Sequence, residues 1–263
     1  MLAHIYSALL AFIVAGMMPL RGQNQPARDD TPGPISTDRP AVTGSSVVVP
    51  GGSLQAENGF LETSSQGQSV LDASETLVCF GVAKKTELRF TVPDYYKNLH
   101  SGVRSGFGDF ALGIKEQLRH KPEGFDVSII LFLSFPTGTN AVSNGGYDPG
   151  LQLPWSRALS AKWTAAGMLS VYWPTQGGMR NVTGEFTFLL DRQLTKPWDS
   201  FIEYAGDFPR VGGPRHLLHL GTALKLATRH QLDFHVGVGL SSGTVDRLIG
   251  IGYSFRIQAL RRE

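Results

Sequence analysis

The chain has 263 residues, a length that fits one large all-β domain as well as two ordinary domains. Only 17% of the residues are charged, the formal net charge is +2 and no basic run occurs, which argues against a nucleic-acid-binding protein. After residue 20 no stretch approaches the roughly 18 consecutive apolar residues of a membrane-spanning helix. If the protein lies in a membrane, it must therefore cross the bilayer with strands.

The first residues are typical of an exported protein. Residues 1–22 are interpreted as a signal peptide, with an apolar stretch from Ile5 to Leu20 and a suitable cleavage position after Gly22. The usual positively charged start is absent, so an uncleaved N-terminal anchor is the alternative. Residues 23–50 are rich in Pro, Asp, Ser and Thr without periodicity, which predicts a flexible periplasmic tail.

From residue 51 to residue 263 the chain falls into short runs in which apolar and polar residues alternate, the pattern of β-strands. In the last run, Ile249, Ile251 and Tyr253 alternate with Gly250 and Gly252. The predicted strands cover about 53–64, 75–82, 87–92, 109–118, 125–135, 151–159, 163–173, 182–191, 199–206, 216–226, 231–240 and 247–257. Their number is even, as in single-chain bacterial outer-membrane barrels.

Two all-β architectures share this alternation, a soluble sandwich and a transmembrane barrel. In a sandwich the polar face meets water, where glycine has little reason to occur. Here the polar face mixes glycines with isolated acids and bases, and the apolar face carries large side chains along whole strands. Small residues inside a narrow barrel make room for long charged neighbours. The sequence therefore favours a single closed antiparallel transmembrane β-barrel of about 12 strands over an exported β-sandwich.

The connections between the predicted strands support the barrel. Long or glycine-rich connections at 93–107, 136–148, 174–180 and 207–215 alternate with short ones. Outer-membrane barrels have short periplasmic turns and longer extracellular loops.

Several segments resemble a family of outer-membrane transporter-like barrels named after the meta-pathway of phenol degradation. They run in order along nearly all of the mature chain: Ser36-Thr37-Asp38-Arg39-Pro40, Leu77-Val78-Cys79-Phe80-Gly81-Val82 with Glu87-Leu88-Arg89-Phe90, Gly106-Phe107-Gly108-Asp109-Phe110 with Gly113-Ile114-Lys115, Phe135-Pro136-Thr137-Gly138-Thr139, Asp148-Pro149-Gly150-Leu151 and Gly250-Ile251-Gly252-Tyr253-Ser254-Phe255-Arg256.

The resemblance implies a location in the outer membrane and passive uptake of small molecules, aromatic or hydrophobic ones among them. Such barrels usually end on an aromatic residue that the assembly machinery reads. Here Ile257 stands in that place, so Phe255 would have to serve. The family transfers no catalytic residues to this chain.

The polar face of the predicted strands supplies the lumen-lining candidates. They are Glu57, Glu87, Arg89, Asp109, Lys115, Asp126, Glu185, Asp191, Glu203, His219, Lys225, Asp233, His235 and Arg256, and Glu75 lies on the same face. Charges of both signs in a small barrel usually pair across strands and plug it. The alternative is a polar conduit whose acidic excess favours cations or neutral polar solutes.

No enzyme is predicted. No G-x-S-x-G elbow occurs, and a set of Ser254, His235 and Asp233 is better explained as ordinary lumen residues. The sequence predicts no cofactor and no metal site. The expected partners are the lipid bilayer of the outer membrane, the barrel-assembly machinery and a small solute, with no nucleic acid. A closed structural barrel without transport and a soluble exported sandwich that binds a ligand remain as alternatives.

Overall fold

The computed structural model describes residues 33–99, 105–120 and 124–260. The chain divides after Pro32, and the described residues all belong to the second unit, Gly33–Glu263. The predicted signal peptide 1–22 and residues 23–32 of the predicted tail lie outside the described residues. Within the described ranges, no helix has the length and apolar character needed to cross a membrane.

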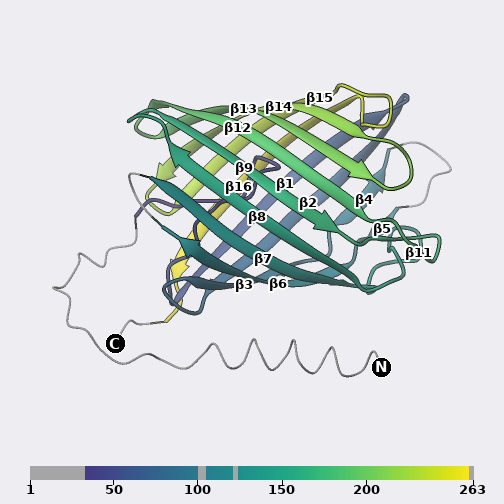
Figure 1. The fold of residues 1–263 in the computed structure, drawn as a ribbon, viewed down its shortest axis with the longest axis horizontal. Helices are drawn as coiled ribbons and strands as arrows, with labels where there is room; N and C mark the ends of the chain where they lie inside the picture. Colours follow the sequence, from purple (N-terminus) through teal and green to yellow (C-terminus); the bar gives the residue numbers. More distant parts are fainter. Residues whose placement is uncertain (1–32, 100–104, 121–123, 261–263) are drawn as a thin grey trace. The chain divides into compact units, whose positions relative to one another are not determined.

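Twelve antiparallel strands of the second unit form a closed ring in the order β1, β2, β3, β6, β7, β8, β9, β12, β13, β14, β15 and β16 (Figure 1). Their bounds are β1 Ser53–Ser65, β2 Gln68–Gly81, β3 Thr86–Thr91, β6 Phe110–Arg119, β7 Phe125–Phe135, β8 Asp148–Ala158, β9 Trp163–Tyr172, β12 Thr183–Thr195, β13 Trp198–Pro209, β14 Arg215–Ala227, β15 His230–Gly239 and β16 Arg247–Gln258. The first and last strands pair from Ser53 with Gln258 to Ser64 with Arg247, which closes the barrel. The predicted fold class is confirmed.

Four short strands complete the described structure. β4 (Tyr95–Asn98) pairs with β2, and β5 (Gly106–Phe107) pairs with β4, so they prolong β3 and β6 beyond a break in each strand. β10 (Thr175–Gln176) and β11 (Met179–Arg180) form a small hairpin of their own.

The strand β2 is longer than the sequence predicts. It begins at Gln68, directly after a tight turn at Gln66 and Gly67, both of which have positive φ angles. A bulge shifts the pairing of β1 with β2 between Glu57 and Gly59. The bulge interrupts the period of two, which hid the first half of the strand.

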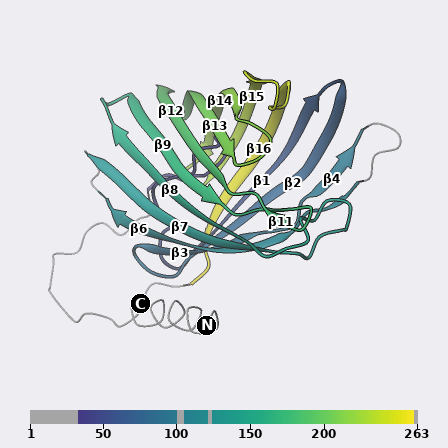
Figure 2. The same ribbon diagram turned by 45° about the vertical axis from the view of Figure 1, so that its right-hand side comes forward.

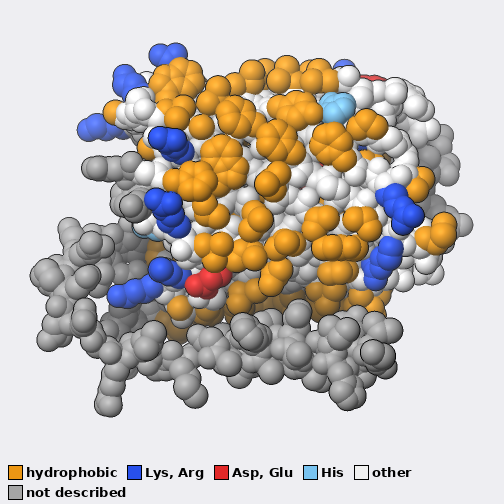
Figure 3. All heavy atoms as spheres, viewed as in Figure 1, with side chains coloured by type: hydrophobic (Ala, Val, Ile, Leu, Met, Phe, Trp, Pro, Cys, Tyr) orange, Lys and Arg blue, Asp and Glu red, His pale blue; other side chains and the backbone are white. Residues whose placement is uncertain are grey.

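The outer face of the barrel is apolar. Ile249, Ile251, Phe234 and Leu220 are 43–49% exposed on neighbouring strands. Hydrophobic side chains cover the middle of the face seen in Figure 3, and Lys and Arg gather toward its two ends. A band of this kind is what the hydrocarbon core of a bilayer requires of a barrel.

The interior is polar. The charged side chains of Glu57, Glu87, Lys115 and Glu203 lie in the lumen and are 1% exposed. In β16 the buried positions Leu248, Gly250, Gly252, Ser254 and Arg256 alternate with exposed apolar ones, as the sequence predicts.

Residues 33–50 differ most from their prediction. Their described structure is not a loose tail: the segment lies inside the barrel, where Ile35, Thr43, Ser46 and Val49 are 3–6% exposed (Figure 2). The prediction of a flexible tail is corrected for this part of it. The segment has no regular secondary structure, so its sequence carries no periodicity by which its burial could be detected.

Candidate functional site

Residues 33–50, called the inner segment below, form a re-entrant loop in the lumen. At one end the amide of Ile35 donates to the carbonyl of Thr228 in the β14–β15 turn (2.8 Å), and Arg256 donates to the carbonyl of Gly33. At the other end the segment continues directly into β1. Both ends therefore lie at the end of the barrel that carries the short turns.

Carboxylates of the barrel wall bind the backbone of the inner segment. A buried chain without regular structure needs partners for its amides. Glu57 of β1 accepts hydrogen bonds from the amides of Asp38 (2.9 Å) and Arg39 (3.0 Å). Glu87 of β3 accepts one from the amide of Val49 (2.6 Å). These charge-assisted bonds fix both arms of the loop to the wall.

Glu203 of β13 binds the tip of the loop. Its two oxygens accept from the successive amides of Val42 (2.9 Å) and Thr43 (2.7 Å). Behind it, His219 Nδ1 lies 2.8 Å from Glu203, and His219 Nε2 lies 2.8 Å from His235 Nδ1. This chain of contacts runs across β13, β14 and β15 and orients the carboxylate toward the segment.

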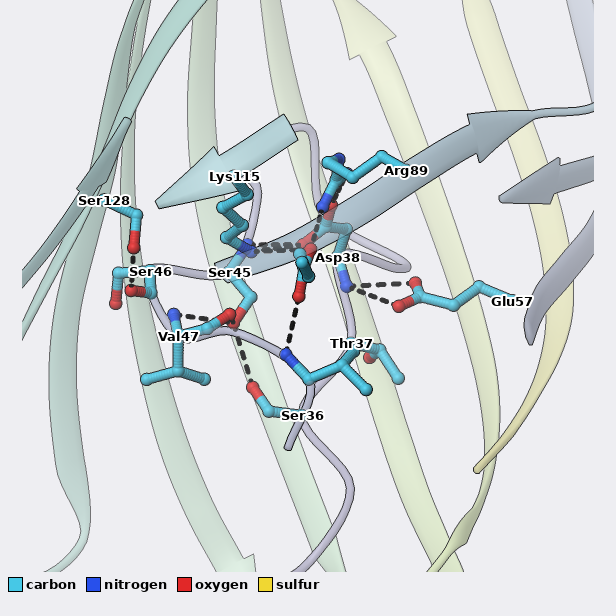
Figure 4. Close-up of polar contacts among 12 residues, drawn as sticks. Ser36, Thr37, Asp38, Ser45, Ser46, Val47, Glu57, Arg89, Lys115 and Ser128 are labelled. Carbon is cyan, nitrogen blue, oxygen red and sulfur yellow. Dashed lines mark hydrogen bonds and ion pairs between the residues drawn. The ribbon is translucent and has the colours of Figure 1, made fainter. Parts of the chain in front are cut away.

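Asp38 is the acidic anchor of the inner segment (Figure 4). Its carboxylate accepts a hydrogen bond from Arg89, lies 3.6 Å from Lys115 Nζ and accepts from the amide of Ser45 (2.8 Å). Glu87 pairs with the other side of Arg89 at 2.7 Å. Burial acts to raise the pKa of Asp38, but the charges of Arg89 and Lys115 outweigh it and hold that pKa below its ordinary value.

Arg39 is the basic anchor. Its Nη1 donates to Glu75 (2.5 Å) and its Nη2 to Asp233 (3.4 Å). Gly59 and Gly252, which are paired across β1 and β16, lie against the guanidinium, and a Cβ at either position would overlap it. Here glycines on the polar face do make room for a long charged side chain.

The structure brings most of the predicted lumen residues together around the inner segment. Direct contacts or ion pairs to it are made by Glu57, Glu87, Arg89, Lys115, Glu203, Asp233 and Arg256. His219 contacts Glu203 on the side away from the segment, and His235 contacts His219. Glu185, Asp191 and Lys225 line cavities beside the segment.

Two predicted residues lie elsewhere. Asp109 precedes β6 and accepts hydrogen bonds from the amides of Gly138 and Asn144, so it holds a connection between strands. Asp126 lies at the start of β7, where it contacts His120, which is 49% exposed.

Cavities border the inner segment on both of its sides. A cavity of about 280 Å³ lies between the segment and wall residues near the short turns, among them Asp191 and Lys225. Cavities of about 260 and 290 Å³ lie toward the longer connections, lined by Glu185, Asp207 and Arg215, and Val42 at the loop tip lines the first of these two. The segment thus lies between a cavity near the short turns and a cavity toward the longer connections.

The imagined set of Ser254, His235 and Asp233 is not a catalytic triad in the described structure. His235 Nδ1 faces His219, and Asp233 faces Arg39. Within the part of the chain that the structure describes, the Ser254 hydroxyl has no hydrogen-bond partner.

Sequence reasoning missed the segment's own contribution, chiefly Asp38, Arg39 and Thr43. One hint was present: Ser36 to Pro40 is the first of the segments that carry the family resemblance. A motif with Asp38 and Arg39 in a segment without periodicity suggests that these two charged side chains bind fixed partners elsewhere in the chain.

A family model described as "Putative MetA-pathway of phenol degradation" matches residues 37–257. The chain belongs to this family. The match begins within the inner segment and ends on β16, so it covers residues 37–50 of the segment together with the barrel. No curated protein matches the chain in sequence.

Solved structures share the fold of this family member. An outer-membrane channel from Pseudomonas putida F1 is 12% identical, with a TM-score of 0.66 over 83% of this chain and 100% of the other. The NanC porin is 9% identical with a TM-score of 0.55, over 78% of this chain and 100% of the other. The KdgM porin is 9% identical with a TM-score of 0.53, over 77% and 98%. The chain is thus an outer-membrane β-barrel in fold.

Proposed function

We propose that the protein is a passive outer-membrane channel for small molecules, closed by the inner segment and opened when that segment leaves the lumen. The observation that carries this proposal is the position of residues 33–50, which separate cavities at the two ends of a closed barrel. Because both ends of the loop lie at the same end of the barrel, the loop can withdraw without threading through it.

The wall chemistry supports small polar or cationic solutes. The wall residues that hold the segment include the acids Glu57, Glu75, Glu87, Glu203 and Asp233, against the bases Arg89, Lys115 and Arg256. A lumen with an acidic excess favours cations and hydrogen-bonding solutes. The family description adds aromatic compounds of phenol degradation as a second class of solute.

A disulfide lock tests the gate. The hydroxyl oxygens of Ser46 in the segment and Ser156 in β8 lie 2.8 Å apart, so cysteines at these positions are within reach of a disulfide. The variant is S46C/S156C, made in a C79A background because Cys79 is the chain's one native cysteine. We expect its current in a planar bilayer to fall at least tenfold on oxidation and to return on reduction.

The single variants S46C and S156C are the matched controls. Neither can form the disulfide within one chain, so the oxidant should leave their currents unchanged. Equal currents from the oxidised and reduced double variant would contradict gating by the segment. A background protein silent in bilayers and in vesicle-swelling assays would favour a closed structural barrel without transport.

We further propose that the chain acts as a channel and not as an enzyme, in keeping with its likeness to channels and porins in fold. Its partners on this proposal are the outer-membrane bilayer, the barrel-assembly machinery and the solute, with no nucleic acid. Incubation with lipid and ester substrates tests the first point: turnover by the purified barrel would overturn it.

A further inference from the structure

Arg39 occupies a notch that four adjacent strands build across the closure of the barrel. Asp233 comes from β15, Gly252 from β16, Gly59 from β1 and Glu75 from β2. We call these four residues the seam notch. The side chain of Asp233 is 0% exposed and that of Glu75 is 20% exposed, and the side chain of Arg39 between them is 12% exposed.

The shape of the seam notch suits a flat cation. The two glycines leave space where any other residue would place a Cβ against the guanidinium. A guanidinium is planar, is more weakly hydrated than an ammonium and offers its donors in a fixed fork. Glu75 and Asp233 take one terminal nitrogen each.

The notch also has unused binding capacity. Oδ2 of Asp233 and Nε of Arg39 are buried, and neither atom has a hydrogen-bond partner among the described residues. Arg39 is held by the covalent path of the inner segment, so it cannot place every donor against the two carboxylates at once. A free cation of the same kind has no such tether.

Departure of Arg39 would leave two wall carboxylates without the guanidinium that pairs them. A carboxylate buried without a partner carries a large desolvation cost, so a replacement cation binds with a favourable free energy. We propose that the seam notch is a guanidinium-binding site, filled by Arg39 in the closed state and available to free guanidino or amidino compounds when Arg39 is absent. This inference deepens the proposed function, since it names a class of solute that competes with the segment.

Removal of the tethered ligand tests the site directly. We expect the full-length R39A variant to bind methylguanidinium with millimolar affinity in a calorimetric titration. Wild-type protein, whose notch is filled, should bind at least tenfold more weakly, and so should R39A/D233N. Methylammonium, which has the charge without the planar fork, should bind R39A at least tenfold more weakly than methylguanidinium.

Binding to R39A no tighter than to the wild type would overturn the inference, and so would equal affinities for methylguanidinium and methylammonium. Heat-modifiable migration in gels shows whether R39A is folded. If it is not, competition in the wild type decides: methylguanidinium should speed amide exchange of residues 33–50 more than methylammonium at equal ionic strength, and no difference overturns the proposal. The disulfide lock tests the gate separately, so a failed gate and a failed site give different results.

Discussion

Asp38 shows at the residue scale how a loop without regular structure is held inside a barrel. Its side chain pairs with Arg89 and Lys115 of two wall strands while its own amide donates to Glu57. The Asp38 carboxylate thus pairs with two cations of the wall, and a carboxylate of the wall accepts the hydrogen bond of its backbone amide. A buried network of this kind stabilises only while each member keeps its partners.

The D38N variant should loosen the inner segment. Arg89 and Lys115 would keep Glu87 but lose their second carboxylate. We expect amide exchange of residues 33–50 to rise about tenfold to a hundredfold, as the loss of about 1–3 kcal/mol would produce. Exchange within β12–β16 should stay unchanged, and an equal rise there would indicate general unfolding instead.

Acid should have a related effect, with a sign fixed by the pKa of Asp38. That pKa is lowered in the folded state by Arg89 and Lys115. The contribution of Asp38 is therefore complete above the ordinary value of about 3.9 and is lost as the pH falls below it. Exchange of the inner segment should accelerate below about pH 4 more steeply in the wild type than in D38N; parallel profiles would contradict the assignment.

At the scale of elements, the strands and the inner segment differed in how far they could be predicted. A strand between lipid and a polar lumen alternates by physical necessity, and β16 could be read residue by residue from Arg247 to Ile257. The candidates on that face, such as Glu57 and Glu203, followed from the alternation alone. The inner segment has no period, and its burial depends on contacts to residues that are distant in sequence, such as Glu203.

Gly81 at the end of β2 provides a test of the packing between segment and wall. A Cβ there would overlap the backbone carbonyls of Val49 and Pro50, which cannot move aside as a flexible side chain can. We expect G81V to lower the free energy of unfolding in urea by about 1–3 kcal/mol. G184V in β12 is the matched control, because no described residue has an atom within 4 Å of the added Cβ. Equal stability of the two variants would show that the segment is not packed as described.

At the scale of the whole molecule, the free-energy cost of a charge on the outer face should depend on its depth in the bilayer. Ile251 faces outward near the middle of β16 and is 49% exposed. We expect I251K to cost about 2–4 kcal/mol of folding free energy in lipid vesicles, because a lysine near the midplane must leave water. I257K, near the end of the same strand and 48% exposed, should cost only about 0–1 kcal/mol. Equal costs would place the bilayer differently on the barrel.

The seam notch that holds Arg39 has a consequence for how the barrel is assembled. Its walls come from the first two and the last two strands of the ring, and its two glycines face each other only in the register that pairs Gly59 with Gly252. A slip of one residue would place Ile251 or Tyr253 opposite Gly59 and turn every side chain of the last strand to the other face. The seam notch therefore forms only after β1 and β16 have paired in the correct register. The docked position of Arg39 therefore requires a correctly closed barrel, because its contacts come from both ends of the sheet.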